Sequence, residues 1–175
     1  MLLTMRNVFT SAGIALAFFL CIMHSAFTVD YKSFHYGIHI TWGDQNLLTG
    51  GPVIGAGIGC IIDYRITNLN NLLLTAGATV FFPYDVHIRN TAAAHIHFDA
   101  AYPLIQMKYF YFDIGLGFLY DIIKSDYYNV NELSIALLAR FSIPGGNFQP
   151  FFQAKLETGG FDTYMLSAGF VFIPV

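Results

Sequence analysis

The sequence predicts an all-β fold in which eight antiparallel strands close, in up-and-down order, into a barrel. Only 11% of the 175 residues are charged, whereas 55% are hydrophobic and 17% are aromatic. An ordinary soluble domain has roughly 25% charged residues. After residue 27 no apolar run reaches the about 18 residues of a membrane-spanning helix. Apolar residues recur instead at every second position, which is the period of a β-strand.

The first 26 residues predict a cleavable signal peptide. Arg6 supplies a positive start, and residues 14–23 (IALAFFLCIM) supply an apolar stretch of the expected length. An uncleaved anchor helix is the alternative, although this stretch is short for a span of ~20 residues. The predicted organisation is therefore a signal peptide (1–26) and one barrel domain (27–175), which keeps a single cysteine and forms no internal disulfide.

Each predicted strand sets an apolar face, without charge or glycine, against a mixed face that collects glycine, histidine and most charges. Residues 33–42 (SFHYGIHITW) and 54–65 (IGAGIGCIIDYR) oppose aromatic or aliphatic residues to His, Gly, Asp and Arg. Residues 72–82 (LLLTAGATVFF) oppose apolar residues to Thr, Gly, Leu and Phe. In residues 95–104 (HIHFDAAYPL) two His and one Asp share the mixed face, and proline falls at the strand end, where a missing donor is tolerated.

The second half of the chain repeats the pattern. Residues 108–120 (KYFYFDIGLGFLY) and 132–142 (ELSIALLARFS) place Asp, Glu and Arg on the mixed face. Residues 151–158 (FFQAKLET) place Lys and Glu there, and residues 163–173 (TYMLSAGFVFI) place Ser and Gly there. Long connections (43–53, 83–93, 121–131) alternate with short ones (66–71, 105–107, 143–150), as an up-and-down barrel requires.

The mixed face is a poor surface for water, because it has few charges and includes Leu73, Phe81 and Leu119. An exported lipocalin-like barrel is the alternative, but its exterior would be predominantly polar. If the apolar face points outward into lipid, the mixed face lies inside and does not have to form a surface for water. Backbone groups in lipid need internal partners, so the sheet must close, and an even number of strands near ten residues is typical of outer-membrane barrels.

Aromatic residues of the apolar face are predicted to form a girdle at both membrane interfaces. The predicted girdle residues are Trp42, Phe82, Tyr120 and Tyr164 at the outer rim, and Phe34, Tyr64, Tyr102, Phe110, Phe141 and Phe172 at the inner rim.

On these features residues 27–175 resemble the small eight-stranded outer-membrane barrels, the group of the OmpA transmembrane domain, OmpX and OmpW. The last strand, YMLSAGFVFIPV, has the alternating pattern that barrel-assembly machinery reads in that group, although the ending Pro174-Val175 departs from its terminal aromatic residue. The resemblance implies the outer membrane of a diderm bacterium, with outer-membrane lipid as partner, long loops outside and termini in the periplasm. An OmpW-like barrel is preferred within the group, because the inward face is partly apolar.

Inside the barrel, a turn centred on Gln106 predicts Asp99 opposite Asp113, and the next loop predicts Arg140 opposite Asp113. Two adjacent carboxylates repel, so Arg140 is expected between them, and His97 or Lys155 extends this cluster. The cluster is either a charged constriction that selects solutes or, as we favour, a salt-bridge plug. The other residues expected to line the lumen are His35, His39, Asp63, Arg65, His95 and Glu157.

No metal site or cofactor is predicted. His35 and His39 lie on one strand face but about 13 Å apart at ~3.3 Å per residue, too far for one ion. His95 and His97 are closer, and a metal shared with a carboxylate is the alternative there. The formal net charge of −3 argues against a nucleic-acid partner, which requires a basic face.

The predicted function is non-enzymatic: a narrow pore for small or hydrophobic molecules, or a structural and surface-interaction barrel whose loops contact extracellular or host ligands. Inward glycines either leave a narrow conduit or make room for opposing rings. The alternative is a lipid-modifying enzyme on the same fold. For that reading only the loop residues His87, Asp121 and Asp126 are candidates, without a supporting motif, so no catalytic residue is predicted.

Overall fold

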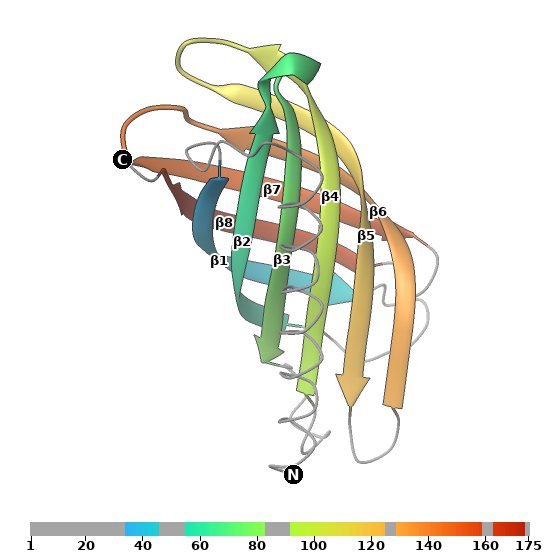
Figure 1. The fold of residues 1–175 in the computed structure, drawn as a ribbon. Coiled ribbons are helices and arrows are strands. Elements are labelled where there is room, and N and C mark those ends of the chain that lie inside the picture. Colours follow the sequence, from blue (N-terminus) through green and yellow to red (C-terminus); the bar gives the residue numbers. More distant parts are fainter. Residues whose placement is uncertain (1–33, 46–54, 83–91, 125–128, 159–162, 174–175) are drawn as a thin grey trace.

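The computed structural model of the chain is a closed barrel of antiparallel strands (Figure 1). It describes residues 34–45, 55–82, 92–124, 129–158 and 163–173. The strands are β1 (Phe34–Gln45), β2 (Gly55–Ile66), β3 (Leu72–Phe82), β4 (Ala92–Gln106), β5 (Tyr111–Lys124), β6 (Asn129–Ser142), β7 (Phe148–Thr158) and β8 (Thr163–Phe172). Each strand pairs with its neighbour in sequence, and β1 pairs with β8 to close the barrel. This confirms the predicted fold class.

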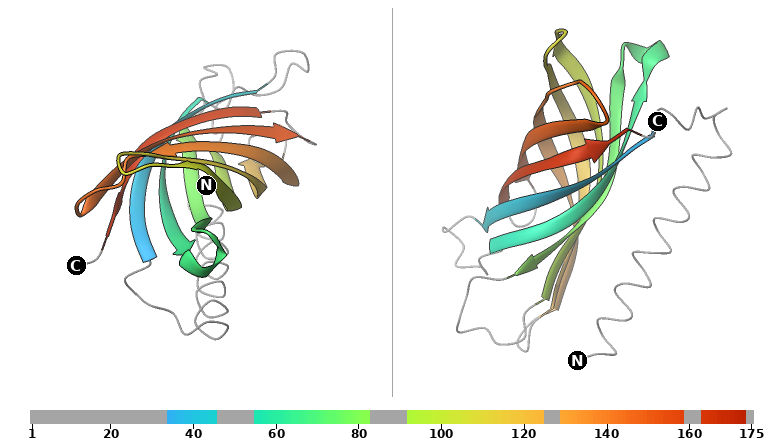
Figure 2. Two further views of the ribbon diagram at one scale, coloured as in Figure 1. Left: turned by 90° about the horizontal axis from the view of Figure 1, so that it is seen from above. Right: turned by 90° about the vertical axis from the view of Figure 1, so that its left-hand side faces the viewer.

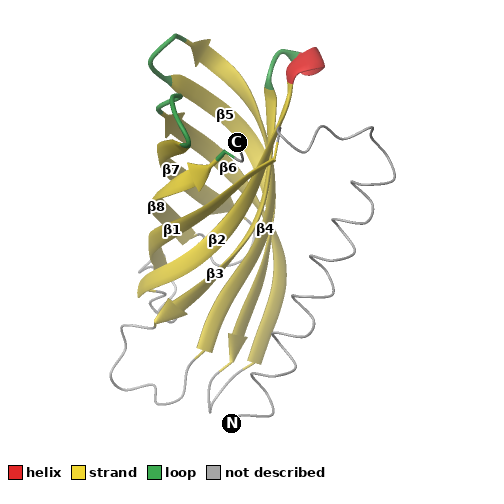
Figure 3. Ribbon diagram, turned by 60° about the vertical axis from the view of Figure 1, so that its left-hand side comes forward, coloured by secondary structure: helices red, strands yellow, loops and turns green. Residues whose placement is uncertain are grey.

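The pleat orients the two faces as the sequence predicts. Ile40 and Leu133, on the apolar face, are 65% and 66% exposed, whereas Asp113 and Ala136, on the mixed face, are fully buried. Apolar residues therefore cover the outside of the barrel. The charged residues buried inside it are Asp63, Asp99, Asp113, Asp121, Arg140, Lys155 and Glu157. None of the described residues belongs to a helix long and apolar enough to cross a membrane. Figure 3 shows the 3-10 turn Thr67–Leu69, in red, between β2 and β3.

We name the two ends of the barrel by their connections. The short-turn end carries the connections 67–71, 107–110 and 143–147, and the loop end is the opposite one, where β1, β3, β5 and β7 finish. The predicted signal peptide and most of the connections 43–53 and 83–93 lie outside the described residues.

The third predicted long connection, 121–131, is wrong. β5 continues to Lys124, and β6 begins at Asn129, so both strands extend through most of it. Polar residues suggested a loop there, but Asp121 and Glu132 occupy inward positions opposite each other in the ladder. Charged residues fit this part of the strands because they face the lumen rather than the outside.

The predicted register of β4 and β5 is also wrong. The turn is closed by a bond from the Met107 amide to the Phe110 carbonyl, 2.9 Å long, and a bulge lies between Pro103 and Ile105. Asp99 therefore lies opposite Gly117 rather than Asp113. No Gly, Pro, Asn or Asp marks a turn in residues 104–110, so the sequence pattern could not locate its centre.

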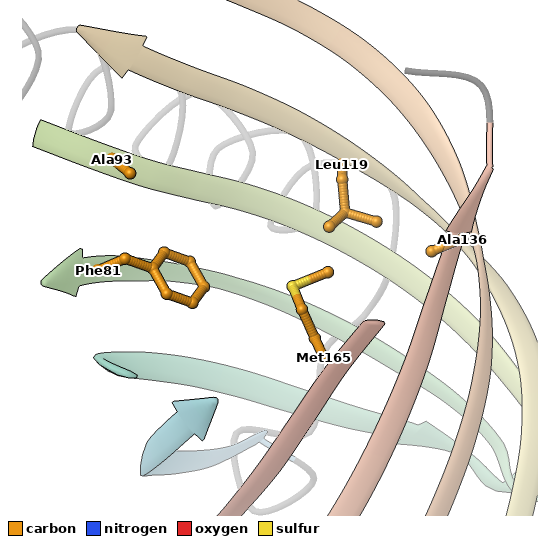
Figure 4. Packing of buried hydrophobic residues seen from close by; sticks show 5 residues of the cluster. All are labelled: Phe81, Ala93, Leu119, Ala136 and Met165. Atoms are coloured by element: carbon orange, nitrogen blue, oxygen red, sulfur yellow. The ribbon is translucent and has the colours of Figure 1, made fainter. Parts of the chain in front are cut away.

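Three buried apolar clusters lie inside the barrel, between the charged groups. The largest, at the loop end, has its side chains directed into the lumen from five strands (Figure 4). Its members are Phe81, Ala93, Leu119, Ala136 and Met165. The two others are Ile61, Phe151 and Val171, and Leu73, Ala101 and Leu138.

The strands are strongly tilted around the barrel (Figure 2), and neighbouring backbones approach closely where inward glycines lie. At Gly115, a Cβ atom would lie 2.1 Å from the Ala100 carbonyl oxygen and 2.5 Å from the Ala101 Cα. A side chain of any size would therefore push β4 and β5 apart at this point.

Replacing Gly115 by Ala should lower the free energy of unfolding by about 1–3 kcal/mol, the usual cost of overpacking. Urea titration of the refolded protein, followed by the fluorescence of its single tryptophan, measures this cost. Leu116→Ile is the matched control, because Leu116 is the next residue and points outward, where a swap of equal volume should change little. Equal stability of Gly115→Ala and the native chain would contradict the close approach.

Candidate functional site

The candidate functional site is the lumen, where side chains from all parts of the barrel meet. At the short-turn end, Arg65 on β2 forms a two-pronged pair with Asp113 on β5, with nitrogen–oxygen distances of 2.7 and 3.1 Å. The guanidinium also lies over the Tyr111 ring, 4.8 Å from its centroid, and donates to the Asn71 carbonyl. This pair spans the lumen from one wall to another, and Arg65 is 16% exposed whereas Asp113 is fully buried.

A second arginine pair lies deeper. Arg140 on β6 donates from both terminal nitrogens to the carboxylate of Asp63 on β2, which is four strands away around the barrel. The Thr75 hydroxyl donates to the same carboxylate over 2.8 Å, and the guanidinium lies 4.1 Å from the Phe151 ring centroid. Both charges are almost completely buried, so hydrogen bonds and the aromatic face replace the water that they lose.

The middle of the lumen holds one ion pair and two histidines. Lys155 Nζ on β7 lies 2.7 Å from Asp99 Oδ2 on β4, and both are buried. His97 Nε2 lies 3.7 Å from the same carboxylate oxygen. His39 shares a hydrogen bond of 2.9 Å with the Thr79 hydroxyl, and its ring centroid lies 6.3 Å from that of His97.

At the loop end, two carboxylates meet in one buried group. His95 Nδ1 lies 2.7 Å from Asp121 Oδ1, and the His95 ring packs 4.5 Å from that of Phe81. Ser134 donates a hydrogen bond to Glu157, and its hydroxyl is 3.4 Å from Asp121 Oδ2. Among the described residues, this group therefore contains more acidic than basic side chains, in contrast to the ion pairs nearer the short-turn end.

The expected Asp99–Asp113–Arg140 cluster is not formed. The ladder does place Asp113 opposite Arg140, but the guanidinium of Arg140 reaches across the lumen to Asp63. Asp113 pairs with Arg65, and Asp99 pairs with Lys155. The expected cluster assumed ion pairs only between neighbouring strands of the sheet. In a narrow closed barrel, long side chains also reach strands on the far side of the lumen.

The remaining predicted lumen residues also point inward. His35 is partly buried opposite Asp63 in the ladder between β1 and β2. The strand alternation did not single out Thr75, Ser134 or Tyr111, although it places them on the inward face. Their role becomes visible only when the partner strand is known, because each contacts a charge from another strand.

The predicted aromatic girdle lies on the outward face, with one exception. Phe34 is 7% exposed, because its ring packs 4.8 Å from that of Tyr64. Two similar ring pairs lie at the short-turn end: Phe110 with Phe141 at 5.4 Å, and Phe148 with Phe172 at 4.8 Å.

Of the three residues considered for an enzyme, Asp121 alone lies among the described residues. Asp121 lies on a strand and is buried, instead of in an exposed loop. Its carboxylate contacts both Ser134 and His95. His87 and Asp126 lie outside the described residues. Within the described ranges, no three His, Cys, Asp or Glu side chains are grouped to hold a metal ion.

Comparison with known proteins supports the fold and identifies no family. No protein-family model matches the sequence, and no characterised protein matches it in sequence. Neisserial surface protein A superposes with a TM-score of 0.59 at 16% identity, over 81% of this chain and 97% of that one. Ail, the attachment invasion locus protein of Yersinia pestis, superposes with a TM-score of 0.45 at 17% identity, over 80% and 97%. At such identities the likeness to the Neisserial protein concerns the fold alone.

The pairing of Arg140 can be tested by double-mutant cycles. Arg140→Met should cost about 3–5 kcal/mol of unfolding free energy, because it leaves a buried carboxylate without its charge partner. Combined with Asp63→Asn, the cost should be much less than additive, whereas combination with Asp113→Asn should be nearly additive. Urea unfolding of the single and double variants provides the four free energies of each cycle. Stronger coupling to Asp113 than to Asp63 would contradict the cross-lumen pair.

Proposed function

We propose that this chain is an integral outer-membrane β-barrel protein with a sealed lumen, which acts as a structural or surface-interaction protein. The observation that carries the proposal is the inverted burial pattern. In this closed barrel the apolar face lies outside, and the ion pairs Arg65–Asp113, Arg140–Asp63 and Lys155–Asp99 lie inside.

The outward face supports the membrane location. Large apolar side chains such as Ile38, Ile58, Leu116 and Phe170 are more than half exposed all around the barrel. A soluble monomer rarely exposes a contiguous apolar patch of more than a few hundred Å², whereas lipid stabilises such a belt. Every described strand has its ladder partners, as the hydrocarbon layer requires.

The sealed lumen is supported by the atoms that occupy the space beside inward glycines. A Cβ atom on Gly59 would lie 2.4 Å from the His39 ring, and one on Gly77 would lie 2.6 Å from the His97 ring. At Gly117 the corresponding distance to Asp99 Oδ1 is 2.0 Å. These glycines make room for lumen side chains, so they do not by themselves leave a conduit, which weighs against the pore alternative.

In the proposed orientation the loop end faces the outside of the cell, and both ends of the barrel chain lie in the periplasm. Outer-membrane lipid and the barrel-assembly machinery are then partners, and extracellular or host molecules are the proposed ligands of the loop end. The preference for an OmpW-like barrel stays a prediction, and it now rests on the three apolar clusters inside the lumen.

Trp42 allows a direct test of membrane insertion, because it is the single tryptophan of the chain and is 48% exposed on the outward face. After refolding into lipid vesicles, its emission should shift to the blue and be quenched by brominated lipids. Quenching should be strongest for bromine near the headgroups, since Trp42 lies toward the loop end. In the variant Trp42→Phe/Ile38→Trp, deep bromine should quench most. Emission that no brominated lipid quenches would contradict insertion.

The sealed lumen predicts that the native protein produces no discrete openings in a planar lipid bilayer. The double variant Asp99→Ala/Lys155→Ala removes the central ion pair and should raise the conductance of the bilayer. This increase is the positive control, because it shows that inserted protein is detected. Discrete openings of the native protein, at the same level as the variant, would refute the sealed lumen and favour the pore.

A further inference from the structure

The hairpin of β4 and β5 projects beyond its neighbour β3 at the short-turn end. The last pair between β3 and β4 is Leu73 with Ala101, whereas β4 continues to Gln106 and β5 begins at Tyr111. The right-hand view of Figure 2 shows this hairpin, in yellow, and the green hairpin of β2 and β3 diverging at the top. We call residues 102–110, which lie beyond the last pair with β3, the hairpin tip.

The regular alternation of exposed and buried side chains ends in the hairpin tip. The register of β4 and β5 shifts between Pro103 and Ile105, so Leu104 is the extra residue of a bulge. From this bulge onward all six residues 104–109 are exposed. Four of the six are apolar or aromatic, namely Leu104, Ile105, Met107 and Tyr109. Adjacent strand residues point to opposite sides, so the tip presents apolar surface on both of its faces and not only on the outward one.

One exposed cation accompanies this apolar surface. Lys108 lies in the turn, and its Nζ atom is 5.4 Å from the centroid of the Tyr109 ring. Asp63 and Asp113 are the described carboxylates closest in sequence to the short turns, and both are buried and paired with arginines. Among the described residues, no exposed carboxylate therefore offsets Lys108 at this end. Lysine and tyrosine beside apolar groups are typical of a membrane interface, where the lysine stem lies along apolar surface and its charge reaches the headgroups.

We propose that the hairpin tip binds anionic phospholipid at the membrane surface of the short-turn end, with its apolar side chains in the interface and Lys108 on the lipid phosphate. The tip is continuous with the outward belt through Tyr102 and Ile114, which are exposed and lie opposite each other in the ladder. One bilayer can therefore cover both surfaces, and the charge of Lys108 is complementary to an anionic headgroup. A second copy of this chain fits less well, because two tips in contact would bring two Lys108 side chains together. The inference rests on the proposed membrane insertion.

The test places a tryptophan reporter in the hairpin tip. Tyr109→Trp, combined with Trp42→Phe, is refolded into phosphatidylcholine vesicles that contain a minor fraction of phosphatidylglycerol in both leaflets. Bromine is carried either by the phosphatidylglycerol or by an equal amount of the phosphatidylcholine, and the ratio of the two quenching strengths measures the preference for the anionic lipid. This preference should be about five-fold, the usual contribution of one lysine near an anionic membrane surface. Lys108→Gln should remove the preference, Lys108→Arg should keep it, and high salt should weaken it.

Leu69→Trp, again with Trp42→Phe, is the matched control. Leu69 is exposed in the turn 67–71, which has no charged residue, and the neighbouring Arg65 is neutralised by Asp113. The reporter at position 69 should therefore be quenched equally by both brominated lipids.

Equal quenching of the reporter at position 109 by the two lipids, or a preference that Lys108→Gln leaves unchanged, would overturn the proposal. A reporter at position 109 that no brominated lipid quenches would overturn it as well. If Trp42 of the native chain is quenched in the same vesicles, membrane insertion stands and this inference alone fails, whereas an unquenched Trp42 contradicts both. Dimers in sedimentation that shield the reporter from every lipid would replace lipid binding with self-association.

Discussion

Every polar side chain that the pleat turns inward must find its partner across a narrow lumen. Eight strands leave an interior just wide enough for side chains to fill, and a buried charge without a partner is costly. Arg140 shows the consequence, since it takes its carboxylate from β2 on the far side of the barrel rather than from its ladder neighbour on β5. Ion pairs of this kind connect walls that share no backbone hydrogen bonds, so they link the closed sheet across its interior.

Space for the large lumen side chains is provided by glycines at the paired positions of the neighbouring strand. The rings of His39 and His97 lie where a Cβ atom on Gly59 or Gly77 would be. The glycines and histidines of the mixed face are therefore complementary parts of one packing arrangement. Three apolar clusters pack in the same lumen among these polar groups.

Charge is distributed unevenly along the barrel. Toward the short-turn end and in the middle, each carboxylate of Asp63, Asp99 and Asp113 has an arginine or lysine partner. At the loop end, Asp121 and Glu157 share the Ser134 hydroxyl, and His95 contacts Asp121.

The sequence by itself determined the strands, their order and the face that each residue takes, because alternation with a period of two is a local property of the chain. It therefore predicted that Asp99, Asp113, Arg140 and Lys155 point into a closed lumen. Only the tertiary structure decided which of these charged side chains form ion pairs with each other. The turn at Met107–Phe110 has no sequence signal, and the bulge after Pro103 changes the register of β4 and β5. Asp99 therefore lies opposite Gly117 and not, as expected, opposite Asp113. β5 and β6 likewise extend past Asp121, whose carboxylate lies beside His95 and accepts a hydrogen bond from Ser134 inside the barrel. Pairing across a closed barrel depends on which strands face each other across the lumen. The spacing of residues along the chain does not give the distance between side chains on such strands.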